Sequence, residues 1–433
     1  MPGPLAGVRI LDYTEIIAGP YGASLLGDMG AEIIKIEPIE GEPLRSQFSF
    51  RPHESRGFLA YNRGKQSLAV NLRDPRGQRI VHELTRSADV FITNYRPDTP
   101  GRLGVDYETL SALNPRLIYV RSTAFGPMGP LANNSGYDII TQAYTGIMTS
   151  IGGERDGLPT TIPTAIADLS TALVNAWSVC GALYTRERTG KGQLIDTSLL
   201  ATAMTVQPSR FVTLGAIDEE RHQQIGAAIV QAHETASYPD GKELVSQARL
   251  LEMQAPSPVP TADRVPSIYY RTYHASDGFV AVGCLSPALR KKFCDALDIH
   301  DPRYDHPLVD PVSEQFRDIG LHLTGLVEER FMSRTVAEWL SHFDRSGVPA
   351  GPVLFAEELR DDEQVSANGL IVKVPHPALG EIEMVGPVVR MSETPLEVRS
   401  AAPELGADTD AILAALGYAP QAIATLRADR VVR

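Results

Sequence analysis

Residues 8–37 read VRILDYTEIIAGPYGASLLGDMGAEIIKIE. Branched apolar residues dominate two short runs in this stretch, 8–12 and 32–36, as is typical of buried strands. The residues between them, 20–29, have the apolar spacing of a helix, with Pro in its first turn and Gly just past its end. A strand, a helix and a second strand in this order predict a parallel sheet that is covered by helices.

The same unit recurs along the chain. Residues 67–72, 90–93 and 117–122 are expected strands, and residues 75–87 are an expected helix. This alternation predicts an α/β fold with a Rossmann-like, doubly wound parallel sheet.

Changes in composition indicate how the chain is divided. We expect a large domain over residues 1–205, completed by residues 375–433, where short strand patterns and an Ala-rich helix end the chain. Residues 206–265 become rich in Pro, Ser and charged residues and are an expected linker. A smaller α+β domain is expected over residues 266–350, followed by a return linker over residues 351–374.

Local signals support the smaller domain. Residues 268–284 have the pattern of a hairpin, with Ser, Asp and Gly at its turn. Ser286 and Pro287 can open one helix, and Thr335 with Glu338 forms a capping box that opens another.

The composition excludes several classes of function. The 40 basic and 53 acidic residues give a net charge of −13, and no basic cluster suggests a nucleic-acid partner. The first residues do not resemble a secretory signal, and no apolar stretch approaches the length needed to cross a membrane. The three cysteines, Cys180, Cys284 and Cys294, lack metal or redox spacing. We therefore expect a cytoplasmic enzyme without a metal site.

The first strand, helix and strand also invite a dinucleotide-binding interpretation. Glu37 ends the second strand, where an acidic residue would hold a ribose. However, Gly19, Gly22 and Gly27 do not form the G-x-G-x-x-G turn that approaches a pyrophosphate. These glycines fit a strand-to-helix turn and close packing better than a nicotinamide site.

Asp168 is the candidate nucleophile. It precedes residues with helical apolar spacing, so it lies where free backbone N–H groups and the helix dipole favour an ionised carboxylate. Such a carboxylate is charged at neutral pH and can attack a thioester carbonyl. The alternative is that Asp168 is only a helix cap.

Basic residues that could bind an anionic ligand occur in two segments. Lys65 precedes an expected strand, whereas Asn94, Tyr95 and Arg96 follow one directly and Arg102 lies just beyond them. Ligands of doubly wound sheets gather at the carboxyl ends of the strands. These cations suit phosphate oxygens, but each can also be an ordinary surface charge.

The segment 122–137 is the expected irregular loop of the large domain. It contains several Gly and Pro residues and leads into a helix near Asp138. Long ordered loops of this kind often line sites. Its Tyr137 is either a binding residue or a buried aromatic, and spacing leaves both interpretations open.

Together these segments resemble the class III coenzyme A transferases, a family that includes formyl-CoA transferases, carnitine and bile-acid CoA transferases and α-methylacyl-CoA racemases. The resemblance covers much of the chain. It is carried by residues 4–12 (PLAGVRILD), 18–37, 62–72 (NRGKQSLAVNL), 88–97 (ADVFITNYRP), 102–104 (RLG), 136–138 (GYD), Asp168, 189–193 (TGKGQ) and 403–406 (PELG).

The resemblance implies that Asp168 accepts the acyl group of a CoA thioester as a mixed anhydride. It implies no permanently bound cofactor, with coenzyme A as substrate, and a homodimer of two interlocked chains. It also implies contacts with coenzyme A at thirteen positions: Ile17, Ala18, Asn62, Arg63, Gly64, Lys65, Asn94, Tyr95, Arg96, Arg102, Gly136, Tyr137 and Asp138.

Three departures from the family pattern bear on the substrate. Pro38 stands where members commonly carry Arg or Lys, which removes one adenine or phosphate contact. The glycine run of oxalate-specific members is absent from residues 210–300, which argues against oxalate or formate. Tyr137 stands where racemases of the family have a histidine base. We therefore expect a CoA transferase, with a racemase and a non-catalytic CoA-binding protein as the alternatives.

Overall fold

The computed structural model describes residues 3–215, 218–235, 237–252, 267–305, 309–310 and 313–433. The chain divides into two compact units. Residues 1–212 and 363–433 form the first unit, and residues 213–362 form the second. The expected large and small domains each lie within one of these units.

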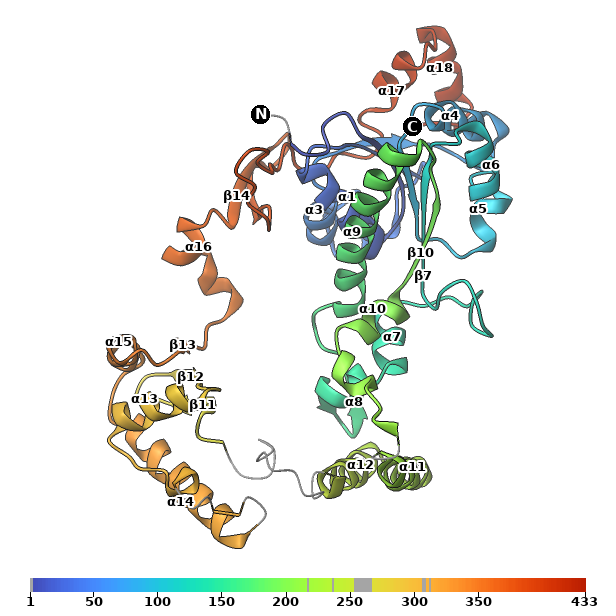
Figure 1. Cartoon of the computed structure of the whole chain (residues 1–433). Coiled ribbons are helices and arrows are strands. Elements are labelled where there is room, and N and C mark those ends of the chain that lie inside the picture. Colours follow the sequence, from blue (N-terminus) through green and yellow to red (C-terminus); the bar gives the residue numbers. More distant parts are fainter. Residues whose placement is uncertain (1–2, 216–217, 236, 253–266, 306–308, 311–312) are drawn as a thin grey trace. The chain divides into compact units, whose positions relative to one another are not determined.

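A six-stranded parallel sheet forms the centre of the first unit (Figure 1). Numbered along the chain, its strands stand in the order 6-5-4-1-2-3, which is the doubly wound arrangement. The expected α/β class with a parallel sheet is therefore confirmed. In spatial order the strands are β10 (Leu194–Ser198), β7 (Ile118–Thr123), β6 (Val90–Thr93), β1 (Arg9–Tyr13), β2 (Glu32–Glu37) and β5 (Lys65–Ala69).

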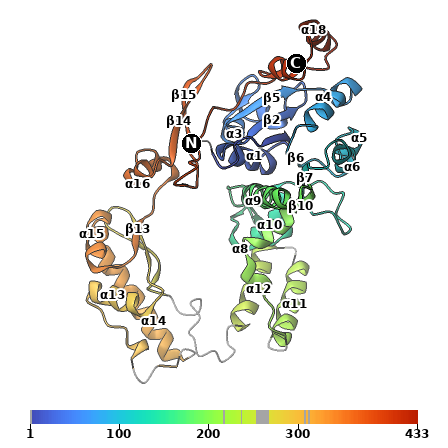
Figure 2. The same ribbon diagram turned by 45° about the horizontal axis from the view of Figure 1, so that its top comes forward.

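Helices cover both faces of this sheet (Figures 1 and 2). Side chains of successive strand residues point to opposite faces. Ile10 and Ile33 therefore pack in one core with α1 (Ala18–Asp28) and α9 (Ile166–Thr189). Leu11 and Ile34 pack in the other core, which includes residues of α4 (Pro75–Thr85) and α6 (Tyr107–Leu113).

Strand β5 differs from the expected strand over residues 67–72. It starts at Lys65 and ends at Ala69, because it pairs with β2 only from Ile33 opposite Lys65 to Glu37 opposite Ala69. Asp74 then caps α4 by accepting the backbone N–H of Arg76 at 2.8 Å. Lys65 is thus part of a strand, whereas the sequence placed it before one.

The C-terminal segment returns to the outer strand of the sheet. The Asp408 side chain accepts the backbone N–H of Ser67 at 2.8 Å, and the Ser67 hydroxyl accepts that of Gly406 at 2.8 Å. The Ala-rich helix is confirmed, and a further helix follows it. This segment contains α16 (Glu363–Ala367), β14 (Ile371–His376), β15 (Gly380–Val385), α17 (Thr409–Ala415) and α18 (Pro420–Ala428).

The second unit has its own core. The predicted hairpin is confirmed, and Ser286 caps its helix as expected. The capping box of Thr335 and Glu338 is also present. The elements of the second unit include β11 (Tyr270–His274), β12 (Phe279–Gly283), α13 (Pro287–Leu297), α14 (Glu314–Phe331), α15 (Val336–Ser346) and β13 (Ala350–Pro352).

The expected linkers contain regular structure. Two helices, α11 (Glu219–Glu234) and α12 (Tyr238–Glu252), pack against each other within the segment 206–265. The Pro-rich part of this segment, residues 253–266, lies outside the described residues. The return segment contains a 3-10 turn (Ala356–Arg360) and α16.

Helix α9 corrects the expectation about membrane spans. Among the described helices, it is the one that is long and apolar enough to cross a membrane. However, Ala176, Val179 and Leu183 of this helix are buried in the core that α1 and α9 form with Ile10 and Ile33 of the sheet. Length and composition are equally typical of such a core helix.

Candidate active site

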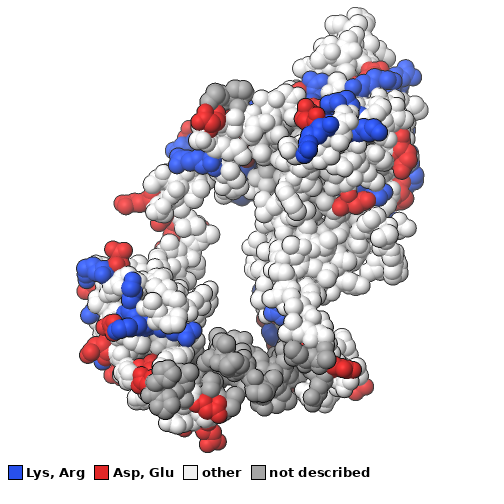
Figure 3. Space-filling view, in the orientation of Figure 1, with Lys and Arg blue, Asp and Glu red and all other residues white. Residues whose placement is uncertain are grey.

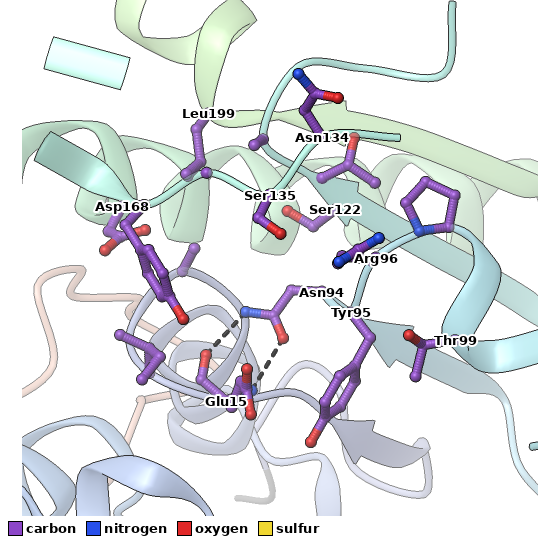
Figure 4. A pocket seen from close by; sticks show the side chains of 17 residues that line it. Glu15, Asn94, Tyr95, Arg96, Thr99, Ser122, Asn134, Ser135, Asp168 and Leu199 are labelled. Carbon is purple, nitrogen blue, oxygen red and sulfur yellow. Dashed lines mark hydrogen bonds between the residues drawn. The ribbon is translucent and has the colours of Figure 1, made fainter. Parts of the chain in front are cut away.

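A pocket opens where the strand order of the sheet reverses, between β1 and β6. In doubly wound sheets this switch point, beyond the carboxyl ends of the strands, is the usual ligand site. Glu15 and Ile16 follow β1, and Asn94 and Arg96 follow β6. Figure 4 shows these segments around the pocket, with Asp168 and Arg96 on opposite sides.

Asp168 is the third residue of α9 and is 8% exposed. Asp138, the first residue of α7 (Asp138–Tyr144), reaches the start of α9 from another element. Its Oδ1 accepts the backbone N–H groups of Ala167 at 2.8 Å and of Asp168 at 3.3 Å. Asp138 thus caps α9. The alternative that Asp168 is merely a cap is therefore wrong, and Asp168 lines the pocket.

The pKa of the Asp168 carboxyl is raised to about 7, first by burial and then by the negative charge of Asp138. This corrects the expectation that the helix start keeps Asp168 fully charged at neutral pH. The N–H groups that would have stabilised its charge are used by Asp138. Asp168 is thus a carboxyl group whose charge changes near neutral pH.

The position of Asp138 is itself fixed by hydrogen bonds. Gln142, one turn further along α7, donates from Nε2 to Oδ2 of Asp138 at 2.6 Å. The Oε1 of the same Gln142 accepts the backbone N–H of Ile162 at 3.0 Å. Gln142 is fully buried. The start of α9, and with it Asp168, is therefore held by a chain of hydrogen bonds from α7.

We expect Asp138→Asn to shift the acidic limb of the activity profile to lower pH. Burial is the first cause of the raised pKa of Asp168 and the charge of Asp138 is the second. The substitution removes this second cause but keeps an oxygen that can cap α9. The measurement is kcat/KM for acyl-CoA against pH. Glu108→Gln, which removes an exposed charge on α6, is the control. An unchanged limb in Asp138→Asn would show that Asp138 does not control Asp168.

The pocket brings together residues that lie far apart in the sequence. Its lining includes seven of the residues that the sequence singled out: Ala18, Asn94, Tyr95, Arg96, Gly136, Tyr137 and Asp168. Ile17, the residue before α1, lies between two lining residues in the sequence. Asp138 is not part of the lining, but it accepts a hydrogen bond from the backbone N–H of Asp168. Arg102 lies outside this lining on α5 (Asp98–Arg102), where it is exposed and pairs with Asp98 at 3.3 Å.

The segment from Asn62 to Lys65 does not face the pocket. Lys65 Nζ is fully buried and donates to Asp12 Oδ2 at 2.7 Å, to the Pro20 carbonyl at 2.8 Å and to Asn62 Oδ1 at 2.8 Å. An ammonium group has only three donors, so none remains for a phosphate. This corrects the expectation that Lys65 contacts coenzyme A.

The neighbours of Lys65 are also bound inside the protein. Arg63 is buried and forms an ion pair with Asp28 at 2.7 Å. Asn62 Nδ2 donates to the Phe58 carbonyl at 3.2 Å. The backbone N–H of Gly64 donates to the Ser400 carbonyl at 2.9 Å. The described contacts therefore give this segment a role in holding α1 and the sheet together.

Glu15 lines the pocket and was not among the residues predicted from the sequence. Burial, followed by the charge of Glu42, raises the pKa of the Glu15 carboxyl. Glu15 follows β1 just as Asn94 follows β6, so the same rule about strand ends could have identified it.

A second pocket in the first unit adjoins the first, because Tyr95 and Thr99 line both. Its other lining residues include Pro38, Arg73 and Leu103. Among the described residues, no group of three or more His, Cys, Asp and Glu side chains is arranged to hold a metal ion.

Comparisons with known proteins identify the family of this chain. Residues 5–246 and 240–409 match the sequence profile of CoA-transferase family III. The chain belongs to this family. It is 33% identical over 416 residues to the succinyl-CoA:glutarate CoA-transferase of Mus musculus, a match covering 95% of this chain and 86% of the relative. The resemblance that the sequence suggested is therefore confirmed.

Another relative of the chain is named for a different acid. The chain is 30% identical over 432 residues to the formyl-CoA:oxalate CoA-transferase of Rhodopseudomonas palustris, covering 98% of this chain and 96% of the relative. A crystal structure of a CAIB/BAIF family protein from Brucella suis matches with a TM-score of 0.71 and 28% identity. That match covers 96% of this chain and the whole of the other. The family is thus clear, whereas its members differ in their acids.

Proposed function

We propose that this family III chain moves coenzyme A from an acyl-CoA thioester to a free carboxylic acid, with Asp168 as the nucleophile. The observation that carries this proposal is the buried carboxyl group of Asp168 at the switch point, with a pKa near neutrality. A poorly solvated carboxylate that is held at a helix start is well suited to attack a carbonyl carbon.

The proposed reaction begins with the Asp168 carboxylate. One oxygen attacks the thioester carbonyl, the carbon–sulfur bond breaks, and coenzyme A leaves as a thiolate, giving a mixed anhydride. The thiolate then attacks the aspartyl carbonyl and releases the donor acid as a carboxylate, leaving an aspartyl thioester. The acceptor carboxylate attacks this thioester, releasing the thiolate and forming a second anhydride. Attack of the thiolate on the acceptor carbonyl gives the new acyl-CoA and restores Asp168.

The two adjoining pockets support a binding mode for coenzyme A. Arg96 lines the first pocket and is 58% exposed at its side chain. Among the described residues, its ion pair is a distant one with Asp98, at 3.8 Å. Its guanidinium can therefore bind phosphate oxygens. We propose that the thioester lies beside Asp168 and that the nucleotide extends past Tyr95 into the second pocket. Arg102, exposed on α5, is proposed to add to the positive field there.

The surface of the first unit supports self-association, and we propose that two chains form the interlocked homodimer. Leu173, Trp177 and Tyr184 follow one another at helical spacing on α9 and are 53%, 73% and 66% exposed. Figure 3 shows a broad surface with few charged side chains over the region of α9 and α10 (Leu199–Thr205). Exposed apolar patches are typical of surfaces that bind another protein.

A panel of thioesters and acids tests the proposed transfer. The protein is incubated with acetyl-CoA, succinyl-CoA or formyl-CoA together with glutarate, oxalate or succinate, and new thioesters are identified by mass. A new acyl-CoA that requires both partners supports the proposal. Tight binding of acyl-CoA without any new thioester would favour the alternative of a non-catalytic CoA-binding protein.

We also expect no racemization. Exchange of an α-proton with inversion needs two groups that transfer protons from opposite faces. None of the 17 lining residues of the pocket is a histidine. The family resemblance implies that Tyr137 stands where racemases have their base. The hydroxyl group of a tyrosine can donate a hydrogen bond, but it lacks the imidazole ring that takes up a proton near neutral pH. In deuterated water without an acceptor, a 2-methylacyl-CoA should therefore keep its α-hydrogen.

Rapid deuterium incorporation with inversion would contradict this expectation. Loss of that exchange in Tyr137→Phe or Asp168→Ala would then identify the proton-transferring group. Exchange that proceeds at the same rate in a sample without the protein would come from the solvent and would not bear on this expectation.

A further inference from the structure

The loop that follows β1 has an unusual backbone conformation at the pocket. Ile16 has φ of +68°, in the left-handed region. A β-branched residue is strained there, and such strain persists only where its surroundings enforce it. Ile16 and its neighbours Glu15 and Ala18 all line the pocket that contains Asp168.

Side chains from different elements bind the backbone of this loop. Asn94, after β6, accepts the N–H of Glu15 at 2.9 Å and donates to the Glu15 carbonyl at 2.8 Å (Figure 4). Glu42, the residue before α2 (Pro43–Ser46), accepts the N–H of Ile16 with Oε2 at 2.8 Å. The strained residue is thus bound by a carboxylate that does not itself line the pocket.

The carboxylate of Glu42 is held firmly. It is 1% exposed, and its Oε1 forms an ion pair with the fully buried Lys35 at 2.9 Å. Lys35 Nζ also donates to the Thr14 carbonyl at 3.0 Å, so it binds the same loop on the other side of Glu15. A hydrogen bond from an N–H group to a charged, desolvated carboxylate is stronger than one between neutral groups. The buried pair can therefore offset the strain at Ile16.

We propose that Glu42 is a positioning residue for the transfer reaction. It holds Ile16 in the left-handed conformation and so fixes part of the wall of the pocket that Asp168 also lines. This inference rests on the proposed function, because a wall needs to be fixed only if chemistry takes place beside it. A purely structural role of Glu42 would instead affect the stability of the fold and leave turnover per folded molecule unchanged.

A double-mutant cycle between Glu42 and Ile16 separates these roles. In the parent, Glu42→Gln should lower kcat about tenfold and change KM for acyl-CoA less than about threefold, because the loop relaxes while the ligand pockets remain. Glycine adopts the left-handed conformation without strain, so the same substitution in an Ile16→Gly background should lower kcat less than about threefold. Circular dichroism and thermal unfolding check that every variant is folded.

Two further variants serve as controls for the double-mutant cycle. Glu54→Gln alters another buried carboxylate and should leave kcat unchanged, since Glu54 pairs with His376 and Arg51 and not with the loop. If Glu42→Gln alone fails to fold because Lys35 is left unpaired, Lys35→Met combined with Glu42→Gln removes both charges and enters the same cycle.

An equal loss of kcat in the parent and in the Ile16→Gly background, or normal kcat in Glu42→Gln, would overturn the proposal. This failure is distinguishable from failure of the proposed function. If Asp168→Asn is inactive while Glu42→Gln is normal, only the positioning role is lost; if Asp168→Asn remains active, the proposed function itself fails.

Discussion

Asp168→Asn is expected to fold normally and to lose CoA transfer by roughly three orders of magnitude or more, as for a residue that forms a covalent intermediate. An amide has nearly the same size as the carboxyl group but is a far weaker nucleophile. The backbone N–H of residue 168 can still donate to Asp138. The measurement is the initial rate of new thioester formation with the best donor and acceptor pair.

The pH dependence of stability provides a check on folding in the same variant. The ordinary pKa of Asp168 is 3.8 and its folded value is about 7, so in this window the folded protein binds more protons than the unfolded chain. Stability of the parent therefore falls as pH rises from about 4 to about 7. Asp168→Asn cannot ionise and escapes this loss, so it should be more stable than the parent at pH 8. Asp168→Asn with near-normal turnover would refute the role of the side chain as nucleophile.

Lys65→Met is expected to lower the free energy of unfolding by roughly 3–5 kcal/mol, because it leaves Asp12 buried without its nearest cation. Burial opposes the charge of Asp12, and attraction by Lys65 and Lys35 holds the pKa of Asp12 below its ordinary value. Methionine keeps the apolar volume of the lysine stem but none of its three hydrogen bonds. Urea unfolding measures the loss.

A second substitution tests the cause of that loss. Asp12→Asn combined with Lys65→Met removes both charges and should lose less stability than the sum of the two single changes. Affinity for acyl-CoA should be close to that of the parent wherever the variants are folded, because Lys65 does not face the pocket. Near-normal stability of Lys65→Met with weakened acyl-CoA binding would instead restore Lys65 as a ligand contact.

Much of the fold could be predicted because its determinants are local. Strand β6 lies at the predicted residues 90–93. The capping box at Thr335 depends on two side chains that are three residues apart in the sequence. The switch-point rule also placed Asn94 and Arg96 at the pocket, because both follow a strand that stands next to β1.

The environments of the charged residues could not be predicted in this way. Lys65 was misplaced because its partners, Asp12 and Pro20, lie 53 and 45 residues away, and a lone lysine has the same sequence signature whether buried or exposed. The pKa of Asp168 depends on Asp138, which reaches α9 from a helix 30 residues earlier. Such effects follow from tertiary contacts, which composition and spacing do not contain.

Trapping of the covalent intermediate tests the central proposal most directly. The protein is mixed with an acyl-CoA, treated with hydroxylamine and digested, and the peptide that contains residue 168 is examined by mass spectrometry. An acyl anhydride or CoA thioester at this carboxyl is expected to give an aspartyl hydroxamate at Asp168, only when acyl-CoA is present and not in Asp168→Asn. Transfer that proceeds with Asp168 unmodified, or with the hydroxamate on a different side chain, would contradict the account.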